Sequence, residues 1–149
     1  MPLVIVVHPP LPIRDTEKMT VRPTLPNPID SVALASLNTP DGWLAYPLGD
    51  DVIEGNPDTR MKLLRTVGVK TPYKAVAFFT SQPSKFDWRF DNDEAFVLIE
   101  GRIAITMDTG ERFEMSAGDA VSIPAGHTGV CEVFEFSRKF TVVTSGSVD

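Results

Sequence analysis

The stretch that decides the fold is "FVLIEGRIAITMDTGERFEMSAGDAVSIPAG", residues 96–126. Within it "RIAITM" alternates, so Ile103 and Ile105 lie on one face of a strand. Gly101 in "IEGRI" and Gly110 in "MDTGERF" stand at chain reversals, where a positive φ costs a glycine little. The stretch ends at "IPAG", and its proline cannot extend a central ladder. We therefore expect short antiparallel strands joined by tight turns.

The same pattern extends outward from this stretch over most of the chain. From Arg60 onward, short runs rich in Val, Ile, Phe and Thr alternate with turn residues, which is typical of an all-β fold. Strands are expected near 60–66, 73–80, 85–90, 94–100, 102–107, 111–115, 119–123, 128–135 and 137–144. Many short strands at even spacing favour a sandwich or a closed barrel, because closure removes exposed strand edges. Helix is expected to be nearly absent.

The N-terminal third is rich in proline. Nine of the 13 prolines fall in the first fifty residues, where a fixed φ and missing N–H groups disfavour regular ladders. We expect residues 1–50 to form an extended arm on the barrel or on a partner subunit, and residues 51–149 to form the barrel. The arm can add strands at a sheet edge, around "VALASL" or "WLAYPL". Trp43 and Tyr46 are interpreted as anchors of this arm, and His8 as an exposed arm residue.

Composition narrows the classes of partner. The chain has 149 residues, a formal charge of −6 and a pI near 4.9, which disfavours nucleic acid and anionic membrane surfaces. Cys131 is the single cysteine, so no intramolecular disulfide forms and an oxidising compartment is not implied. The opening "MPLVIVVHPP" has no basic leader, and its apolar run is too short for a signal or a membrane span. We expect a cytoplasmic protein whose partners are small molecules or proteins.

The segment "DEAFVLIEGRIAITMDTGERFEMSAGDAVSIPAGHTGVCEVFEFSRKFTVV", residues 93–143, resembles the cupin superfamily. The "DE…IEG" hairpin, the "GDAVSIPAG" turn and the closing "RK" strand are similar to the branch with ureidoglycine-aminohydrolase-like and ethanolamine-utilisation-like proteins. With the lead-in "DVIEGNPDTRMKLLR", the resemblance covers residues of about 52–143. It implies a single conical jelly-roll β-barrel. Such barrels pair through sheet faces and exchanged terminal strands, so a homodimer is expected.

The resemblance also implies where a metal ion would be bound. Metal-binding cupins follow G(x)5HxH(x)3–4E(x)6G and G(x)5PxG(x)2H(x)3N, which supply three histidines and one glutamate. Here Glu94 keeps the glutamate position, but the histidine positions hold Trp88, Phe90 and Gly129. A divalent transition ion needs three or four converging donors, and one carboxylate does not hold it tightly. No metal cofactor is therefore expected.

A weak or non-standard divalent site stays open as a fallback. His127 and Cys131 lie two residues on either side of Gly129, so both share strand parity with that ligand position. Together with Glu94 they supply three donors. In the alternative interpretation, His127 hydrogen-bonds a turn carbonyl at the rim and Cys131 is a small buried hydrophobe.

The altered ligand positions predict a different kind of pocket. Trp88 and Phe90 flank Arg89 and share a face, which the resemblance turns inward as an apolar floor for a small planar ligand. If the carboxylate of Glu94 faces the interior, it must be paired or have a pKa raised by desolvation. In either state it can form hydrogen bonds to a bound ligand or act on it as an acid or base. In the alternative, the aromatic side chains face outward and Glu94 lies in a solvated cluster with Asp91 and Asp93.

The closing strand adds a basic pair. Arg138 and Lys139 in "SRKF" must face opposite sides of one strand, so one of them can enter the pocket and neutralise Glu94 or a substrate carboxylate. The candidate site residues are Trp88, Phe90, Glu94, His127, Cys131, Arg138 and Lys139.

Three functions are compatible with this pattern. The first is a metal-independent cupin that binds a small organic molecule. The second is an isomerase, lyase or aminohydrolase-like enzyme for a small metabolite, with Glu94 as the catalytic acid/base. The third is a dimeric interaction protein in which a filled barrel is only a scaffold. A cavity of a few hundred Å³ counts against the third.

Overall fold

The computed structural model of the chain describes residues 32–66 and 73–147. Their elements are β1 (Trp43–Ala45), the 3-10 helix η2 (Gly49–Asp51), β2 (Val52–Gly55), β3 (Arg60–Thr66), β4 (Tyr73–Ser81), β5 (Ser84–Phe90), β6 (Asn92–Glu100), β7 (Arg102–Met107), β8 (Arg112–Ser116), β9 (Ala120–Ile123), β10 (His127–Val133) and β11 (Ser137–Ser147). Among these residues, no helix has the length and apolar character needed to cross a membrane.

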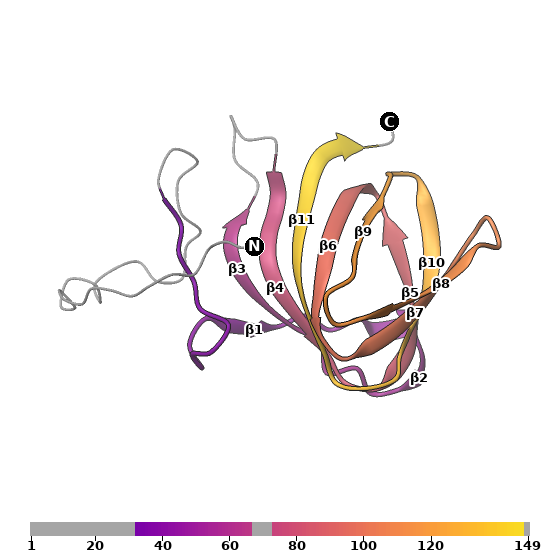
Figure 1. The fold of residues 1–149 in the computed structure, drawn as a ribbon, viewed down its shortest axis with the longest axis horizontal. Coiled ribbons are helices and arrows are strands. Elements are labelled where there is room, and N and C mark those ends of the chain that lie inside the picture. The colour runs from indigo at the N-terminus through magenta and orange to yellow at the C-terminus, as the bar shows by residue number, and fades with distance from the viewer. Residues whose placement is uncertain (1–31, 67–72, 148–149) are drawn as a thin grey trace, which may run out of the picture.

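The strands form two antiparallel sheets that face each other as a jelly-roll β-barrel (Figure 1). Sheet A has the order β1-β3-β4-β11-β6-β9, and sheet B has the order β2-β5-β10-β7-β8. The core lies between them, and it is built from alternate residues of both sheets because strand side chains alternate between faces. Its buried members are Phe86, Phe90, Phe96, Leu98, Ile103, Ile105, Met107, Met115, Ile123, Cys131 and Val133. The all-β prediction is confirmed.

One end of the barrel is closed by tightly packed turns. Gly101, between β6 and β7, has a φ of +95°, as expected for a reversal. A Cβ at this position would lie 2.8 Å from the Cα of Ser137 and would also meet the carbonyl oxygen of Phe136. A Cβ at Gly55 would lie 3.0 Å from the carbonyl oxygen of Pro83. The turns at this end therefore pack closely against each other.

The nine strands expected from Arg60 onward are all present, with ends that differ by up to three residues. Of the two segments proposed for a sheet edge, "WLAYPL" supplies β1, which pairs antiparallel with β3. "VALASL" forms no strand within the described residues. β2 was not among the expected strands; it pairs with β5 at the edge of sheet B. Residues 1–31, with His8 and most of the proline-rich arm, lie outside the described residues.

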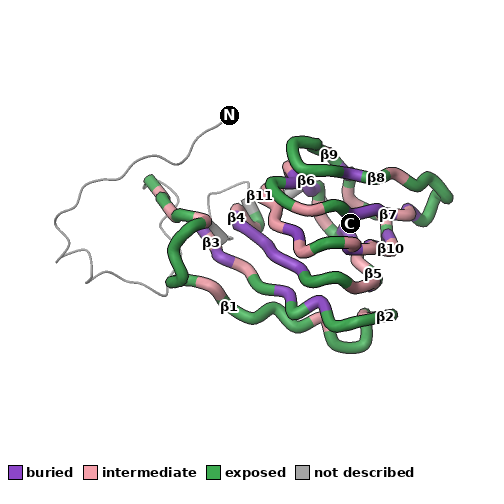
Figure 2. Tube along the Cα trace, turned by 60° about the horizontal axis from the view of Figure 1, so that its bottom comes forward, coloured by how far each residue is buried: buried purple, intermediate pink, exposed green. Residues whose placement is uncertain are grey.

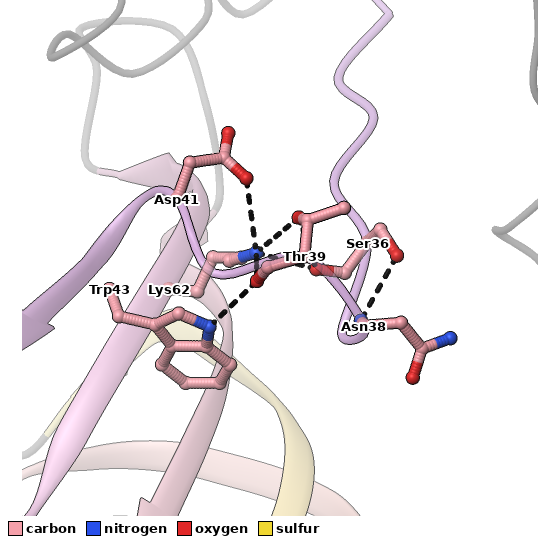
Figure 3. Close-up of polar contacts among 6 residues, drawn as sticks. All are labelled: Ser36, Asn38, Thr39, Asp41, Trp43 and Lys62. Carbon is pink, nitrogen blue, oxygen red and sulfur yellow. Dashed lines mark hydrogen bonds and ion pairs between the residues drawn. The ribbon is translucent and has the colours of Figure 1, made fainter.

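The segment before β1 is attached to sheet A by a buried lysine (Figure 3). The ammonium group of Lys62 donates to the carbonyl oxygens of Ser36 at 2.6 Å and Thr39 at 2.9 Å. The Trp43 ring lies 5.3 Å from this ammonium, and its indole N–H donates to Thr39 O. Burial lowers the pKa of Lys62, which Asp41 partly opposes. Trp43 thus anchors this segment, which is otherwise exposed (Figure 2).

Candidate functional site

A cavity of about 240 Å³ opens where β5 ends and β6 begins, opposite the closed end of the barrel. It is lined by Tyr46, Met61, Ala75, Ala77, Phe79, Trp88, Arg89, Phe90, Asp91, Asn92, Glu94, Lys139, Thr141 and Val143. A smaller void of about 40 Å³ lies deeper in the core and shares Phe79, Trp88, Phe90 and Lys139 with it. Both sheets therefore contribute to one cavity at the barrel mouth.

Three aromatic rings form one side of this cavity, which we call the aromatic wall: Tyr46, Phe79 and Trp88. Each ring touches the other two, with centroid separations of 5.9, 6.1 and 5.7 Å. Trp88 and Phe90 share the inward face of β5, while Arg89 between them is exposed and pairs with Asp91 at 3.4 Å. The side chains of Trp88 and Phe90 thus line the cavity, as expected from parity.

Glu94 and Lys139 form a buried ion pair at the base of the cavity. Glu94 is 5% exposed, and its Oε2 accepts a hydrogen bond from Lys139 Nζ at 3.1 Å and from Thr141 Oγ1 at 2.7 Å. The ammonium group also lies 4.1 Å from the ring centroid of Phe96, with Phe79 and Trp88 slightly farther away. Alternation along β11 turns Lys139 and Thr141 toward Glu94 on the neighbouring strand β6.

The ion pair fixes the charge state of Glu94. Burial alone would raise its pKa, but the charge of Lys139 and hydrogen bonds from Thr141, Lys139 and Trp88 outweigh burial and hold the pKa of Glu94 below its usual range. The carboxylate is therefore ionised at neutral pH. Because a low pKa makes a weak base, this carboxylate is better suited to holding its neighbours than to removing a proton from a substrate.

The two basic residues of "SRKF" face opposite sides of β11. Lys139 faces the cavity, whereas Arg138 pairs with Glu100 through Nε at 2.7 Å. The Arg138 guanidinium lies 5.6 Å from the ring centroid of Phe136, and the residue lines only the deeper void. Lys139 is thus the partner of Glu94.

His127 and Cys131 do not join Glu94 at the cavity. His127 Nδ1 lies 2.9 Å from an oxygen of Asp108, in the turn after β7, so its partner is a carboxylate and not the expected turn carbonyl. The other oxygen of Asp108 accepts from the backbone N–H of Thr128 at 3.0 Å. Cys131 is buried and lines only the deeper void. Burial raises the pKa of its thiol to about 12, which favours the neutral thiol.

The residues at the cupin metal position do not fit a tightly bound divalent ion. A Cβ added at Gly129, one of the three histidine positions, would lie 3.0 Å from Ile105 Cγ2 and 3.4 Å from Phe90 Cε2, so apolar side chains already fill this space. The carboxylate of Glu94 is held by Lys139. Across residues 32–66 and 73–147, no group of three or more His, Cys, Asp or Glu side chains gathers as a metal site would require.

Several cavity residues were not expected from the sequence. Tyr46 was interpreted as an anchor of the arm, but its ring lines the cavity beside Trp88. Ala75, Ala77 and Phe79 alternate along "AVAFF", and this spacing would have indicated one shared face. Thr141 lies two residues after Lys139 on the same strand. This spacing would have indicated that both side chains face the same side of β11.

Comparison with known proteins found one matching domain family and several structures of similar fold. Residues 72–140 match the family model of the EutQ-like cupin domain. The fold is similar to an ethanolamine utilization protein Q of Salmonella typhimurium LT2, with 22% identity over 60% of this chain and 71% of that chain and a TM-score of 0.53. It is also similar to Clostridium difficile EutQ, with 25% identity over 59% of this chain and 63% of that chain and a TM-score of 0.52.

A third similar structure is the ectoine synthase of P. lautus, with 15% identity over 64% of this chain and 70% of that chain and a TM-score of 0.54. At such low identity the likeness to the synthase concerns the fold alone. This chain spans less than two thirds of the Clostridium difficile protein. No curated protein matches the sequence.

Proposed function

We propose that the chain, whose residues 72–140 match the family model of the EutQ-like cupin domain, binds a small organic molecule at the barrel mouth without using a metal ion. One observation carries the proposal. The cavity of about 240 Å³ has the aromatic wall on one side and the Glu94–Lys139 pair at its base. Apolar cavities with a few convergent polar groups are typical ligand sites.

The size and lining of the cavity favour a small planar ligand. Drug-sized ligands occupy cavities of about 300–1,000 Å³. Because this cavity has a volume of about 240 Å³, its ligand is expected to be smaller than a drug-sized molecule. The faces and edges of Tyr46, Phe79 and Trp88 offer stacking and edge-to-face contacts to a ring or another flat group.

Binding is favoured over the two other functions by specific observations. A proton-transfer enzyme would need Glu94 as a free base, but its pKa is lowered and Lys139 and Thr141 hold its Oε2. A pure scaffold would have a filled barrel, and the cavity counts against that.

A thermal-shift screen of small planar compounds tests the proposal, because a ligand that binds only the folded chain raises Tm. Ala75 lines the cavity, so Ala75→Leu fills space without touching the ion pair. Ala117→Leu makes the same change at an exposed turn and is the matched control. We expect at least one compound to raise Tm by about 2 °C or more in the wild-type chain and in the control, but not in Ala75→Leu. A screen without any shift, or a shift that persists in Ala75→Leu, contradicts the proposal.

We also propose that the chain acts as a homodimer in the cytoplasm, with no nucleic-acid or membrane partner. The outer side of sheet A supports the dimer, because it carries an apolar groove, which we call the outer groove. This groove is lined by Ala95, Phe96, Val97, Ala120, Val121, Ser122, Phe140 and Val142. Apolar surface of this kind is commonly covered by a partner, and an isologous contact between two copies would cover both grooves at once.

A further inference from the structure

We infer that the ammonium group of Lys139 makes the polar contact with the ligand, and that the ligand is a neutral molecule with a hydrogen-bond-accepting oxygen, such as a carbonyl or amide. This inference rests on the proposed function, because it names the chemical class of ligand for the same cavity.

The ammonium group of Lys139 has more donors than acceptors around it. A lysine ammonium has three N–H donors. Among the described residues, Glu94 is the one hydrogen-bond acceptor of Lys139 Nζ, at 3.1 Å. The rings of Phe79, Trp88 and Phe96 surround the same group but are not strong acceptors. A buried donor without an acceptor is costly, so the remaining N–H groups favour an incoming oxygen.

The remaining donors of Lys139 face the cavity. The Lys139 side chain is 16% exposed and lines both the cavity and the deeper void. The hydroxyl of Thr141 already donates to Glu94, and the indole of Trp88 contributes to the lowered pKa of that carboxylate. Lys139 is therefore the charged group at the base of the cavity with donors to spare.

The charges around the cavity are balanced. Lys139 is matched by Glu94, and Arg89 at the rim is matched by Asp91. An anionic ligand that reaches Lys139 would come close to the ionised carboxylate of Glu94, while a cationic ligand would meet the ammonium itself. Because charges repel more strongly in a poorly solvated site than in water, both are disfavoured. A neutral acceptor meets neither repulsion.

Four small aromatic compounds separate these possibilities. Benzamide, benzoate and benzamidine have nearly the same shape and are neutral, anionic and cationic, respectively, and toluene has no acceptor. The full chain is titrated with each compound while the amide and indole N–H signals are followed by two-dimensional NMR. We expect benzamide to bind more tightly than each of the other three by about tenfold or more. Binding of benzoate, benzamidine or toluene that equals or exceeds that of benzamide overturns the inference.

A double variant tests the role of the ion pair. Glu94→Leu/Lys139→Met removes both charges at similar side-chain volume, and such replacements are often tolerated. The advantage of benzamide over toluene is expected to disappear in this variant, and an advantage that persists overturns the inference. The ranking in the wild-type chain is a complete test by itself if the variant does not fold.

The two proposals fail in different ways. If none of the four compounds, toluene included, shifts the signals of cavity residues such as Trp88, the cavity does not bind such ligands, and the proposed function fails together with the inference. If toluene or a charged compound binds at the cavity as well as benzamide, the proposed function stands and only the chemical class is wrong.

Discussion

At the residue scale, Lys139 and Glu94 form a buried ion pair inside the barrel. Their side chains are 16% and 6% exposed, so each charge has lost most of its water and relies on the other. Thr141 adds a hydrogen bond to the carboxylate. The ammonium group of Lys139 also lies close to the rings of Phe79, Trp88 and Phe96. A change in the charge of the pair would therefore also affect how these rings pack.

Breaking this pair from one side is expected to be costly. Glu94→Gln leaves the Lys139 ammonium buried without a counter-charge, and we expect a loss of about 3 kcal/mol in the free energy of unfolding. The control is Glu94→Leu/Lys139→Met, which removes both charges and should cost about 1 kcal/mol or less. Urea denaturation of the three proteins measures this difference. A Glu94→Gln variant as stable as the wild-type chain would show that the pair is not buried as described.

The lowered pKa of Glu94 predicts a pH dependence. The usual pKa of 4.5 applies to the unfolded chain, which therefore takes up this proton at a higher pH than the folded chain does. The contribution of Glu94 to stability is thus fully present above about pH 4.5 and is lost as the pH falls through the folded-state pKa.

Because other acidic groups titrate in the same range, the double variant Glu94→Leu/Lys139→Met is again the reference. The free energy of unfolding of the wild-type chain, relative to that variant, should stay constant above about pH 5 and fall as the pH is lowered below about 4.5. A difference that stays constant or grows on acidification contradicts the assignment.

At the scale of the elements, the hairpin between β6 and β7 closes the end of the barrel opposite the cavity. Gly101 and Gly110 have nearly the same φ, +95° and +94°, but a Cβ at Gly101 would collide with Phe136 and Ser137, whereas nothing lies within 4 Å at Gly110. Gly101→Ala should therefore cost about 1–3 kcal/mol more than Gly110→Ala, since the backbone strain is common to both. Thermal or chemical denaturation of the two variants measures it, and equal losses would contradict this packing.

Much of this arrangement of elements could be predicted from local pattern. Strands such as β7 follow from alternation in "RIAITM", and the inward face of Trp88 and Phe90 follows from parity. β2 was missed because a strand of four residues carries little pattern of its own and is defined by its pairing with β5.

The partner of Glu94 needed tertiary information. Alternation along the strand predicts that Arg138 and Lys139 face opposite sides. It does not predict which of them faces inward, because that depends on the register of β11 on β6. This register shifts between the two residues. Tyr46 reaches the cavity from a segment far from Trp88 in the sequence, and no local pattern reveals such a contact.

At the scale of the whole molecule, the outer groove predicts an assembly. Val142 lines this groove and is partly exposed. Sedimentation velocity should find the wild-type chain as a dimer at micromolar concentration and Val142→Lys as a folded monomer, because a buried lysine at the contact would lose its hydration. Thr128→Lys, at an exposed position on β10, is the control and should remain dimeric. A wild-type monomer, or a dimer that tolerates Val142→Lys, contradicts the assigned face.

The central claim is that an ammonium–carboxylate pair and an aromatic wall take the place of a metal centre in this cupin. The most direct test is elemental analysis, per chain, of protein purified without chelators, compared with Glu94→Ala. We expect manganese, iron, nickel and zinc well below one equivalent in both proteins, because the position of the lost histidines is filled by apolar side chains. Near-stoichiometric metal in the wild-type chain that disappears in Glu94→Ala would contradict the claim.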